Sequence, residues 1–146
     1  MCECIVCGVK PVDRKVEPFD RTTATTINIV CPRCGSYSYK IMRGSEFEQG
    51  WIDDFKEKFQ KDFWKVSYYI RKRQNKEPVI IDFDVLEDFI ENGAMPNHRE
   101  QADNLLIWLG DNTFYNQEYS FKNHLVASIV GVRDTTDIEF IAKCFY

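Results

Sequence analysis

The chain has 146 residues, of which 44% are hydrophobic and 14% aromatic. That composition supports a real core in one domain, or in a small metal-stabilised unit plus a second compact unit, and it excludes a disordered chain. The net charge of −4 is unevenly spread, because residues 77–146 carry four Lys or Arg against thirteen Asp or Glu, a balance of −9. Nucleic-acid contact needs concentrated positive potential, so we expect none along that half.

The N-terminal part is dominated by two short cysteine pairs, separated by 23 residues. They are Cys4-Ile5-Val6-Cys7-Gly8 and Cys31-Pro32-Arg33-Cys34-Gly35. Four thiolates at this spacing can surround one Zn²⁺ tetrahedrally, and each glycine allows the tight turn that directs backbone N–H groups at sulfur. We therefore predict one structural Zn²⁺ bound by Cys4, Cys7, Cys31 and Cys34.

Other interpretations of the cysteines are weaker. A disulfide framework is disfavoured by the paired spacing and by the absence of a secretion signal, and both point to the reducing cytoplasm. Reduced, unligated thiols remain an alternative, whereas a redox pair would precede a helix in a βαβ unit. Cys2 can compete as a ligand, although Cys4 has the better spacing. Cys144 falls on an apolar helical face and is expected to be an inert core thiol.

Residues 1–44 are predicted to form the zinc ribbon. Residues 22–30 are rich in β-branched side chains and should contain a strand entering the second cysteine pair. Residues 37–42 alternate and should form the strand leaving it, while residues 10–16 are a weaker candidate for a third strand. Residues 17–20 are expected to be a loop.

Residues 45–146 are predicted to be mainly helical. Ser45 and Glu48 form a capping-box pattern, and apolar residues then recur every three or four positions, which predicts one long helix from 45 to about 74 with Gly50 as its weak point. Three shorter elements follow. The first lies after a short apolar run at 79–83 and is capped by Asp84, and the second begins at Pro96-Asn97 and stops at Gly110-Asp111.

The type of the segment 121–132 is ambiguous. A second capping box at 136–139 starts the last helix, which has no stop signal before Tyr146. Because the apolar pattern is interrupted there, we expect the chain to be part of a longer protein, truncated before a downstream domain. The predicted fold class is α+β: a small Cys4 zinc ribbon with a short antiparallel sheet, then an α-helical bundle that could be winged-helix-like.

Two groups of basic residues are candidate nucleic-acid contacts. In the ribbon these are Arg33, Lys40 and Arg43, with Tyr37 and Tyr39 as stacking groups. At the end of the long helix, Arg71 and Arg73 belong to a basic run at 71–76 that could touch phosphate. The same run also complements the negative end of the helix dipole, which is the simpler explanation.

The sequence shows no catalytic motif. Glycine-rich phosphate loops, a nucleophile elbow and the HExxH helix are absent, and four cysteines leave a bound metal no open position for substrate. We therefore expect this chain not to be an enzyme.

The order of motifs resembles the N-terminal module of bacterial anti-phage defence and nucleotide-targeting effector proteins. The matching segments are Cys31-Pro32-Arg33-Cys34-Gly35-Ser36-Tyr37, Tyr69-Ile70-Arg71, and 96–110. The resemblance implies a zinc ribbon and helices that precede an enzymatic domain. The first hypothesis is therefore a non-catalytic recognition or regulatory module that binds a protein partner or senses a trigger. The alternative is a nucleic-acid-binding ribbon protein.

Overall fold

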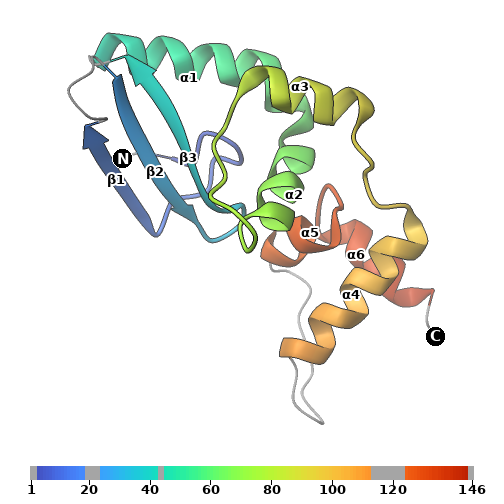
Figure 1. The fold of residues 1–146 in the computed structure, drawn as a ribbon. Coiled ribbons are helices and arrows are strands. Elements are labelled where there is room, and N and C mark those ends of the chain that lie inside the picture. Colours follow the sequence, from blue (N-terminus) through green and yellow to red (C-terminus); the bar gives the residue numbers. More distant parts are fainter. Residues whose placement is uncertain (1–2, 19–23, 43–44, 113–123, 145–146) are drawn as a thin grey trace.

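The computed structural model describes residues 3–18, 24–42, 45–112 and 124–144, and shows a small sheet followed by helices (Figure 1). The elements in chain order are β1 (Asp13–Pro18), β2 (Ala24–Cys31), β3 (Gly35–Met42), α1 (Ser45–Phe59), the 3₁₀ turn η1 (Gln60–Asp62), α2 (Phe63–Arg73), α3 (Phe83–Asn92), α4 (His98–Asn112), α5 (His124–Val130) and α6 (Thr135–Lys143). The predicted α+β class, with an antiparallel sheet first, is confirmed.

The sheet is an antiparallel meander in the order β1-β2-β3. Alternation along the strands places Ile27 and Ile29 of β2, and Tyr37 and Tyr39 of β3, on one face, where all four are buried. The opposite face carries polar and charged residues, as expected for an antiparallel sheet covered on one side. Residues 17–18, predicted to lie in a loop, belong to β1.

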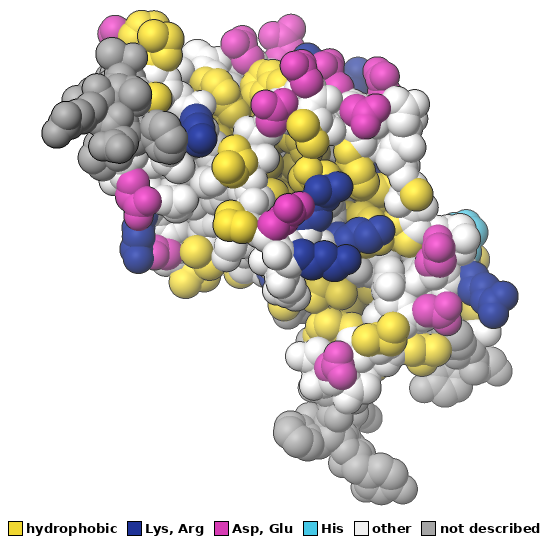
Figure 2. Space-filling view, viewed as in Figure 1, with side chains coloured by type: hydrophobic (Ala, Val, Ile, Leu, Met, Phe, Trp, Pro, Cys, Tyr) yellow, Lys and Arg dark blue, Asp and Glu magenta, His cyan; other side chains and the backbone are white. Residues whose placement is uncertain are grey.

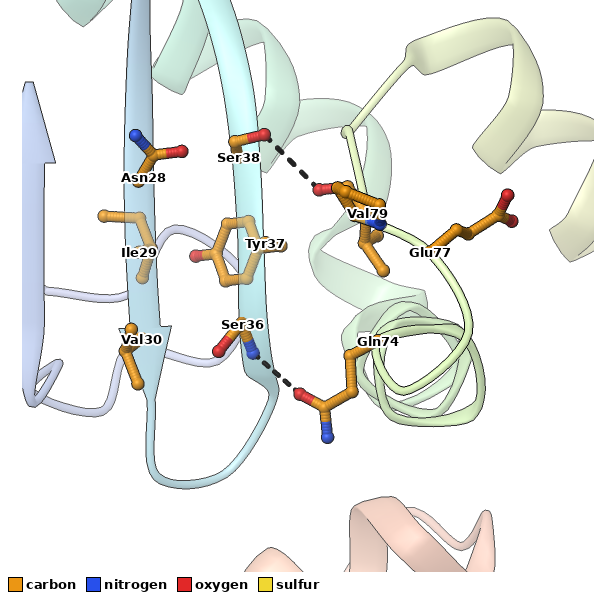
Figure 3. A pocket seen from close by; sticks show the side chains of 10 residues that line it. Asn28, Ile29, Val30, Ser36, Tyr37, Ser38, Gln74, Glu77 and Val79 are labelled. Atoms are coloured by element: carbon orange, nitrogen blue, oxygen red, sulfur yellow. Dashed lines mark hydrogen bonds between the residues drawn. The ribbon is translucent and has the colours of Figure 1, made fainter. Parts of the chain in front are cut away.

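The apolar run after α2 closes one edge of the sheet. Ser38 donates its backbone N–H to Val79 (2.8 Å), and its carbonyl accepts from Ile81 N–H (2.7 Å), so Ile80 forms a parallel bridge with Ser38. Beside this contact lies a pocket of 180 Å³, where Gln74 Oε1 accepts from Ser36 N–H at 2.9 Å (Figure 3). The bridge joins residues that are far apart in the chain, so the sequence pattern did not predict it.

The segment predicted as one helix from 45 to about 74 is divided by η1. Gly50 lies inside α1, so the break comes at Phe59 and the residues after it rather than at the glycine. A 3₁₀ turn tightens the backbone and lets the two helices take different directions (Figure 1). As a result α1 packs its aromatic face on β3, and α2 packs against both β3 and α5.

An aromatic cluster fastens α1 to the sheet. The rings of Tyr39 and Trp51 are stacked, with centroids 4.6 Å apart, and Trp51 continues to Phe55 at 5.5 Å and to Phe83 at 5.2 Å. Offset aromatic pairs of this kind add about 0.5–1.5 kcal/mol each beyond the burial of their area. This first apolar cluster extends from the cysteine pairs to Leu86 of α3, and so it includes residues on both sides of the predicted boundary at residue 44.

A second apolar cluster joins α4, α5 and α6. Its buried members include Leu105 and Trp108 of α4, Val126 and Val130 of α5, and Ile138 of α6. The ambiguous segment 121–132 contains α5, and its residues 121–123 lie outside the described part of the chain. Within the described ranges, no helix has the length and apolar character needed to cross a membrane.

The predicted start of α4 at Asn97 is confirmed, because Asn97 Oδ1 accepts from the N–H groups of Arg99 and Glu100, whereas the predicted caps of α3 and α6 lie two residues too late. Asp82 caps α3 by accepting from the N–H groups of Asp84 and Val85, two residues before the predicted cap. Asp134 caps α6 in a capping box with Asp137, again two residues early, because its carboxylate reaches the N–H groups of the first turn. Glu48 does not complete a box: its carboxylate pairs with Arg14 and accepts from Tyr39 Oη at 3.2 Å.

Candidate metal centre

Two glycine turns build the site, as predicted. In the first, Gly8 has φ +74° and donates to Cys4 O at 2.8 Å, which folds the chain back so that Cys4 N–H reaches Val9 O at 2.9 Å. In the second, Gly35 has φ +93° and pairs with Cys31 across the β2–β3 hairpin. Positive φ is strained for any residue with a Cβ, so both turns depend on glycine.

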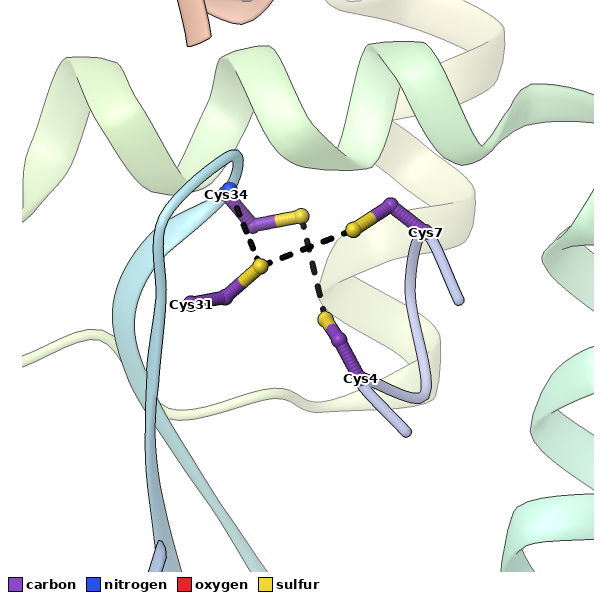
Figure 4. Close-up of side chains that lie close together, drawn as sticks. All are labelled: Cys4, Cys7, Cys31 and Cys34. Atoms are coloured by element: carbon purple, nitrogen blue, oxygen red, sulfur yellow. Dashed lines mark hydrogen bonds between the residues drawn. The ribbon is translucent and has the colours of Figure 1, made fainter. Parts of the chain in front are cut away.

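The four predicted ligands, Cys4, Cys7, Cys31 and Cys34, converge (Figure 4). All four Sγ atoms lie within 4.8 Å of one another, with Cys7 and Cys31 3.5 Å apart and Cys4 and Cys34 3.9 Å apart. None of them is in a disulfide. Tetrahedral metal–sulfur bonds of about 2.3 Å place the sulfurs about 3.8 Å from one another, so the cluster has the donor type and the size that a metal ion requires.

Two buried hydroxyl groups contact the sulfurs. Tyr37 Oη lies 3.1 Å from Cys4 Sγ, and Ser67 Oγ of α2 lies 3.0 Å from Cys34 Sγ. Cys34 N–H also donates to Cys31 Sγ at 3.4 Å. Both side chains are nearly inaccessible, with exposed fractions of 4% for Tyr37 and 0% for Ser67, so each buried hydroxyl has a sulfur as its hydrogen-bond partner.

The thiols differ in acidity because they share their protons. Hydrogen bonds with Cys34, Cys4 and Cys7 lower the pKa of Cys31 far below its usual value. For Cys4, the contact with Cys31 raises the pKa, but the contacts with Cys34 and Cys7 together lower it more, to about 7. The pKa values of Cys7 and Cys34 are raised, first by their contacts with Cys31. Because the thiolate is the form that binds a metal, a metal entering the cluster must displace the protons that these thiols hold.

Burial and the neighbouring Cys4 raise the pKa of Tyr37 well above its usual value, so its hydroxyl stays protonated and acts as the donor.

Arg71 of α2 holds the second cysteine pair from outside. Its Nε donates to Arg33 O at 2.9 Å, and its Nη2 donates to Pro32 O at 2.7 Å and to Cys31 O at 3.5 Å. The guanidinium therefore fixes three consecutive carbonyls of the turn and places a positive charge next to the thiolates. Phosphate contact, the role predicted for Arg71, would compete with these bonds, because Nε and Nη2 already donate to the carbonyls of the turn.

Arg33 connects the cysteine turn to the second apolar cluster. Its side chain is only 7% exposed, its guanidinium carbon lies 4.8 Å from the centroid of the Phe63 ring, and its Nη2 donates to Arg133 O at 2.9 Å. Arg133 lies in the turn between α5 and α6. Arg33 Nε is buried and has no hydrogen-bond partner among the described residues.

The other predicted nucleic-acid contacts do not form one surface with Arg33. Tyr37 faces the sulfurs. Lys40 is exposed, because side chains alternate along β3 and its side chain lies on the outer face of the sheet. Arg73 is exposed, pairs with Glu77 at 3.1 Å and lies 4.8 Å over the Tyr69 ring. Arg43 lies outside the described residues. Nucleic-acid contact through this set stays a prediction.

Three further residues complete the comparison with the sequence analysis. Ser67 was missed, although a serine inside an apolar helical stripe, four residues before Arg71, is a signal that could have identified it. Cys144 was expected in a core, but it is exposed at the end of α6, because the apolar face of that helix is formed by Ile138 and Ile141. Cys2 lies outside the described residues.

Comparisons of the chain with protein-family models, with curated proteins and with solved structures found no match.

Proposed function

We propose that the chain is a non-catalytic recognition or regulatory module of a bacterial effector, stabilised by one structural Zn²⁺. The observation that carries the proposal is the closed set of four sulfurs, because a metal with four cysteine ligands has no position for a substrate or a water nucleophile. Zinc is the metal we assign, since an all-thiolate tetrahedral site in a cytoplasmic protein suits it best. The resemblance of the cysteine and helix motifs to effector modules supports the biological setting.

The position of the cysteines supports a structural role for the metal. Three of them, Cys4, Cys31 and Cys34, are buried in the first apolar cluster, and Arg33 reaches from their turn to the α5–α6 turn of the second. A metal at this point stabilises the arrangement of both clusters, on which any surface for a protein partner or a trigger would depend.

Metal analysis and spectroscopy test the proposal. We expect one zinc per chain after purification without added metal. Replacement by Co²⁺ should give the visible absorption of tetrahedral thiolate coordination, and chelation at neutral pH should abolish cooperative unfolding. Finding iron instead of zinc would change the identity of the metal in the proposal but not its structural role. Full stability after complete metal removal would refute the structural role, and turnover of a nucleotide or nucleic acid would refute the non-catalytic assignment.

Nucleic-acid binding is the second candidate. It is supported by the exposed basic side chains at the end of α2, Lys72, Arg73 and Lys76, and by Lys40 on the sheet. It is not favoured by Arg33 and Tyr37, whose polar groups are turned inward. Binding of an oligonucleotide that weakens steeply with salt, and that is lost in Lys40→Glu, would establish it in place of the protein-partner hypothesis.

A further inference from the structure

A large cleft lies where α2 ends against α4 and α5. Its volume is 510 Å³, within the range of 300–1,000 Å³ that is typical of small-molecule sites. Basic side chains gather at the middle of the molecule in Figure 2, between the part that carries α3 and the part that carries α4. None of the four cysteines lines the cleft, so it is separate from the metal centre.

The charges in the cleft have one sign. Among the described residues that line it, Arg71 and Lys72 are the charged ones, and none is a carboxylate. This is a local exception in a chain of net charge −4. The bonds of Arg71 to the cysteine turn use Nε and Nη2, so Nη1 is not engaged in them. Lys72 is exposed, with its Nζ 5.7 Å from the centroid of the Tyr68 ring. The charge of Arg71 is shared with the thiols of the cysteine turn, whereas Lys72 has no carboxylate beside it among the described lining residues, so this pair favours an anionic ligand at Lys72.

The floor of the cleft is apolar and partly aromatic. Tyr68 and Trp108 are exposed by only 7% and 8%, and the half-buried Leu125 and Ile129 lie beside them. A simple inorganic anion gains no binding energy from contact with these apolar side chains. A ligand with a flat organic body gains from covering it, because each Å² of apolar surface removed from water is worth about 25 cal/mol.

Carboxamides supply the remaining polar lining. Asn104 Nδ2 donates to Val130 O at 3.3 Å, and Asn112 Nδ2 donates to Trp108 O at 2.9 Å, so each amide is held with its nitrogen toward the backbone and offers its oxygen as an acceptor. Gln74 is held the opposite way, because its Oε1 accepts from Ser36 N–H at 2.9 Å and its Nε2 remains a donor. Donors and acceptors next to an apolar floor match the edge of a nucleobase.

We propose that this cleft binds a nucleoside phosphate, with the phosphate at Lys72 and Arg71 and the base over the floor formed by Tyr68 and Trp108. The inference rests on the proposed function, because it names the chemistry of the trigger that the module senses. The same chemistry can come from a free nucleotide or from one nucleotide of a single strand, and the test below separates these sources.

Calorimetry on the zinc-loaded full chain provides the test. The probes are adenosine, guanosine and uridine monophosphates and triphosphates, their nucleosides, inorganic phosphate, and an eight-nucleotide RNA. We expect at least one nucleotide to bind at least tenfold more tightly than phosphate or its own nucleoside. Lys72→Glu should weaken that binding at least tenfold. The matched control is Lys61→Glu, an equally exposed lysine of η1 outside the cleft, and it should change binding less than twofold.

Every outcome of the titration is decisive. Binding of the RNA but not of free nucleotides keeps the cleft and identifies the single strand as the source. Phosphate binding as tight as nucleotide binding, no saturation by any probe at millimolar concentration, or equal effects of Lys72→Glu and Lys61→Glu would overturn the proposal. Zinc content and circular dichroism of each variant show whether it is folded, and Asn75→Asp, at another exposed lining position, repeats the charge test.

Chromatography of the same samples separates this inference from the proposed function. Nucleotide that binds and is converted to product refutes the non-catalytic assignment and leaves the cleft in place. Absence of both binding and conversion refutes nucleotide binding in the cleft and leaves the non-catalytic assignment in place.

Discussion

Replacement of Arg33 by methionine tests whether the cysteine turn and the α5–α6 turn are energetically linked. Methionine keeps an unbranched side chain of similar length over Phe63, but it cannot donate to Arg133 O, which Arg33 Nη2 reaches at 2.9 Å. Arg33 lies between Cys31 and Cys34, but its side chain contacts Phe63 and Arg133 O, so we expect the four candidate ligands to be unchanged. We expect Arg33→Met to be less stable than the wild type, with zinc content unaffected.

The magnitude follows from three contributions. A hydrogen bond from a charged donor is worth about 1.5–3 kcal/mol, and a cation over an aromatic ring about 0.5–1 kcal/mol or somewhat more when buried. One contribution has the opposite sign. Arg33 Nε is buried without a hydrogen-bond partner among the described residues, so removing it recovers part of the lost free energy of unfolding. The net expectation is a loss of about 2 kcal/mol, which is about a 30-fold change in the ratio of folded to unfolded protein.

Urea denaturation of the zinc-loaded proteins measures this loss. With an m-value of about 2 kcal/mol per molar, the midpoint of Arg33→Met should fall by about 1 M. Arg99→Met is the matched control, because Arg99 is exposed on α4, and its effect should stay within about 0.5 kcal/mol. An unchanged midpoint for Arg33→Met, or an equal loss for Arg99→Met, would show that the buried guanidinium does not connect the two clusters.

Three further perturbations test the metal centre and its turns. Ser67→Ala removes a hydroxyl 3.0 Å from Cys34 Sγ and should weaken zinc binding about tenfold in competition with a chromophoric chelator; unchanged affinity would contradict a role for this hydroxyl. Gly35→Ala should destabilise the protein by about 1–2 kcal/mol, because residue 35 has a φ of +93°. Gly50→Ala lies inside α1 with open space around the new Cβ and should stabilise the protein by about 0.5–1 kcal/mol. Equal effects of the two substitutions in thermal unfolding would refute the turn argument. The raised pKa values of Cys7 and Cys34 favour their protonated forms in the metal-free protein, so zinc binding should release protons and weaken as pH falls; a pH-indicator titration without proton release would contradict this.

The metal site was the most predictable part of the molecule. A cysteine pair with two intervening residues and a following glycine has few conformations available, and both Gly8 and Gly35 adopt the expected positive φ. The fold class followed from equally local signals: β-branched and alternating segments before residue 43, and helical periodicity after it.

The roles of individual side chains depended on tertiary contacts and were not predictable. Alternation along β3 separates Tyr37 and Tyr39 from Ser38 and Lys40, but it does not say which face a helix covers, and so Tyr37 was taken as a surface stacking group. Arg33 was counted as a surface charge because the acceptor it reaches, Arg133 O, is 100 residues away. The break at η1 has no proline or glycine to mark it and results from packing on two different partners.

The two edges of the sheet have different consequences for self-association. Residues 79–81 bond to Ser38 at the outer edge of β3, so the N–H and carbonyl groups of Ser38 are not available to a second chain. Within the described residues, β1 pairs only with β2, and its other edge carries the charged residues Asp13, Lys15 and Glu17. Charges on an edge strand oppose the addition of another strand. Neutral substitutions of these charged residues of β1 would therefore remove a barrier to strand addition and lower the concentration up to which the protein stays monomeric.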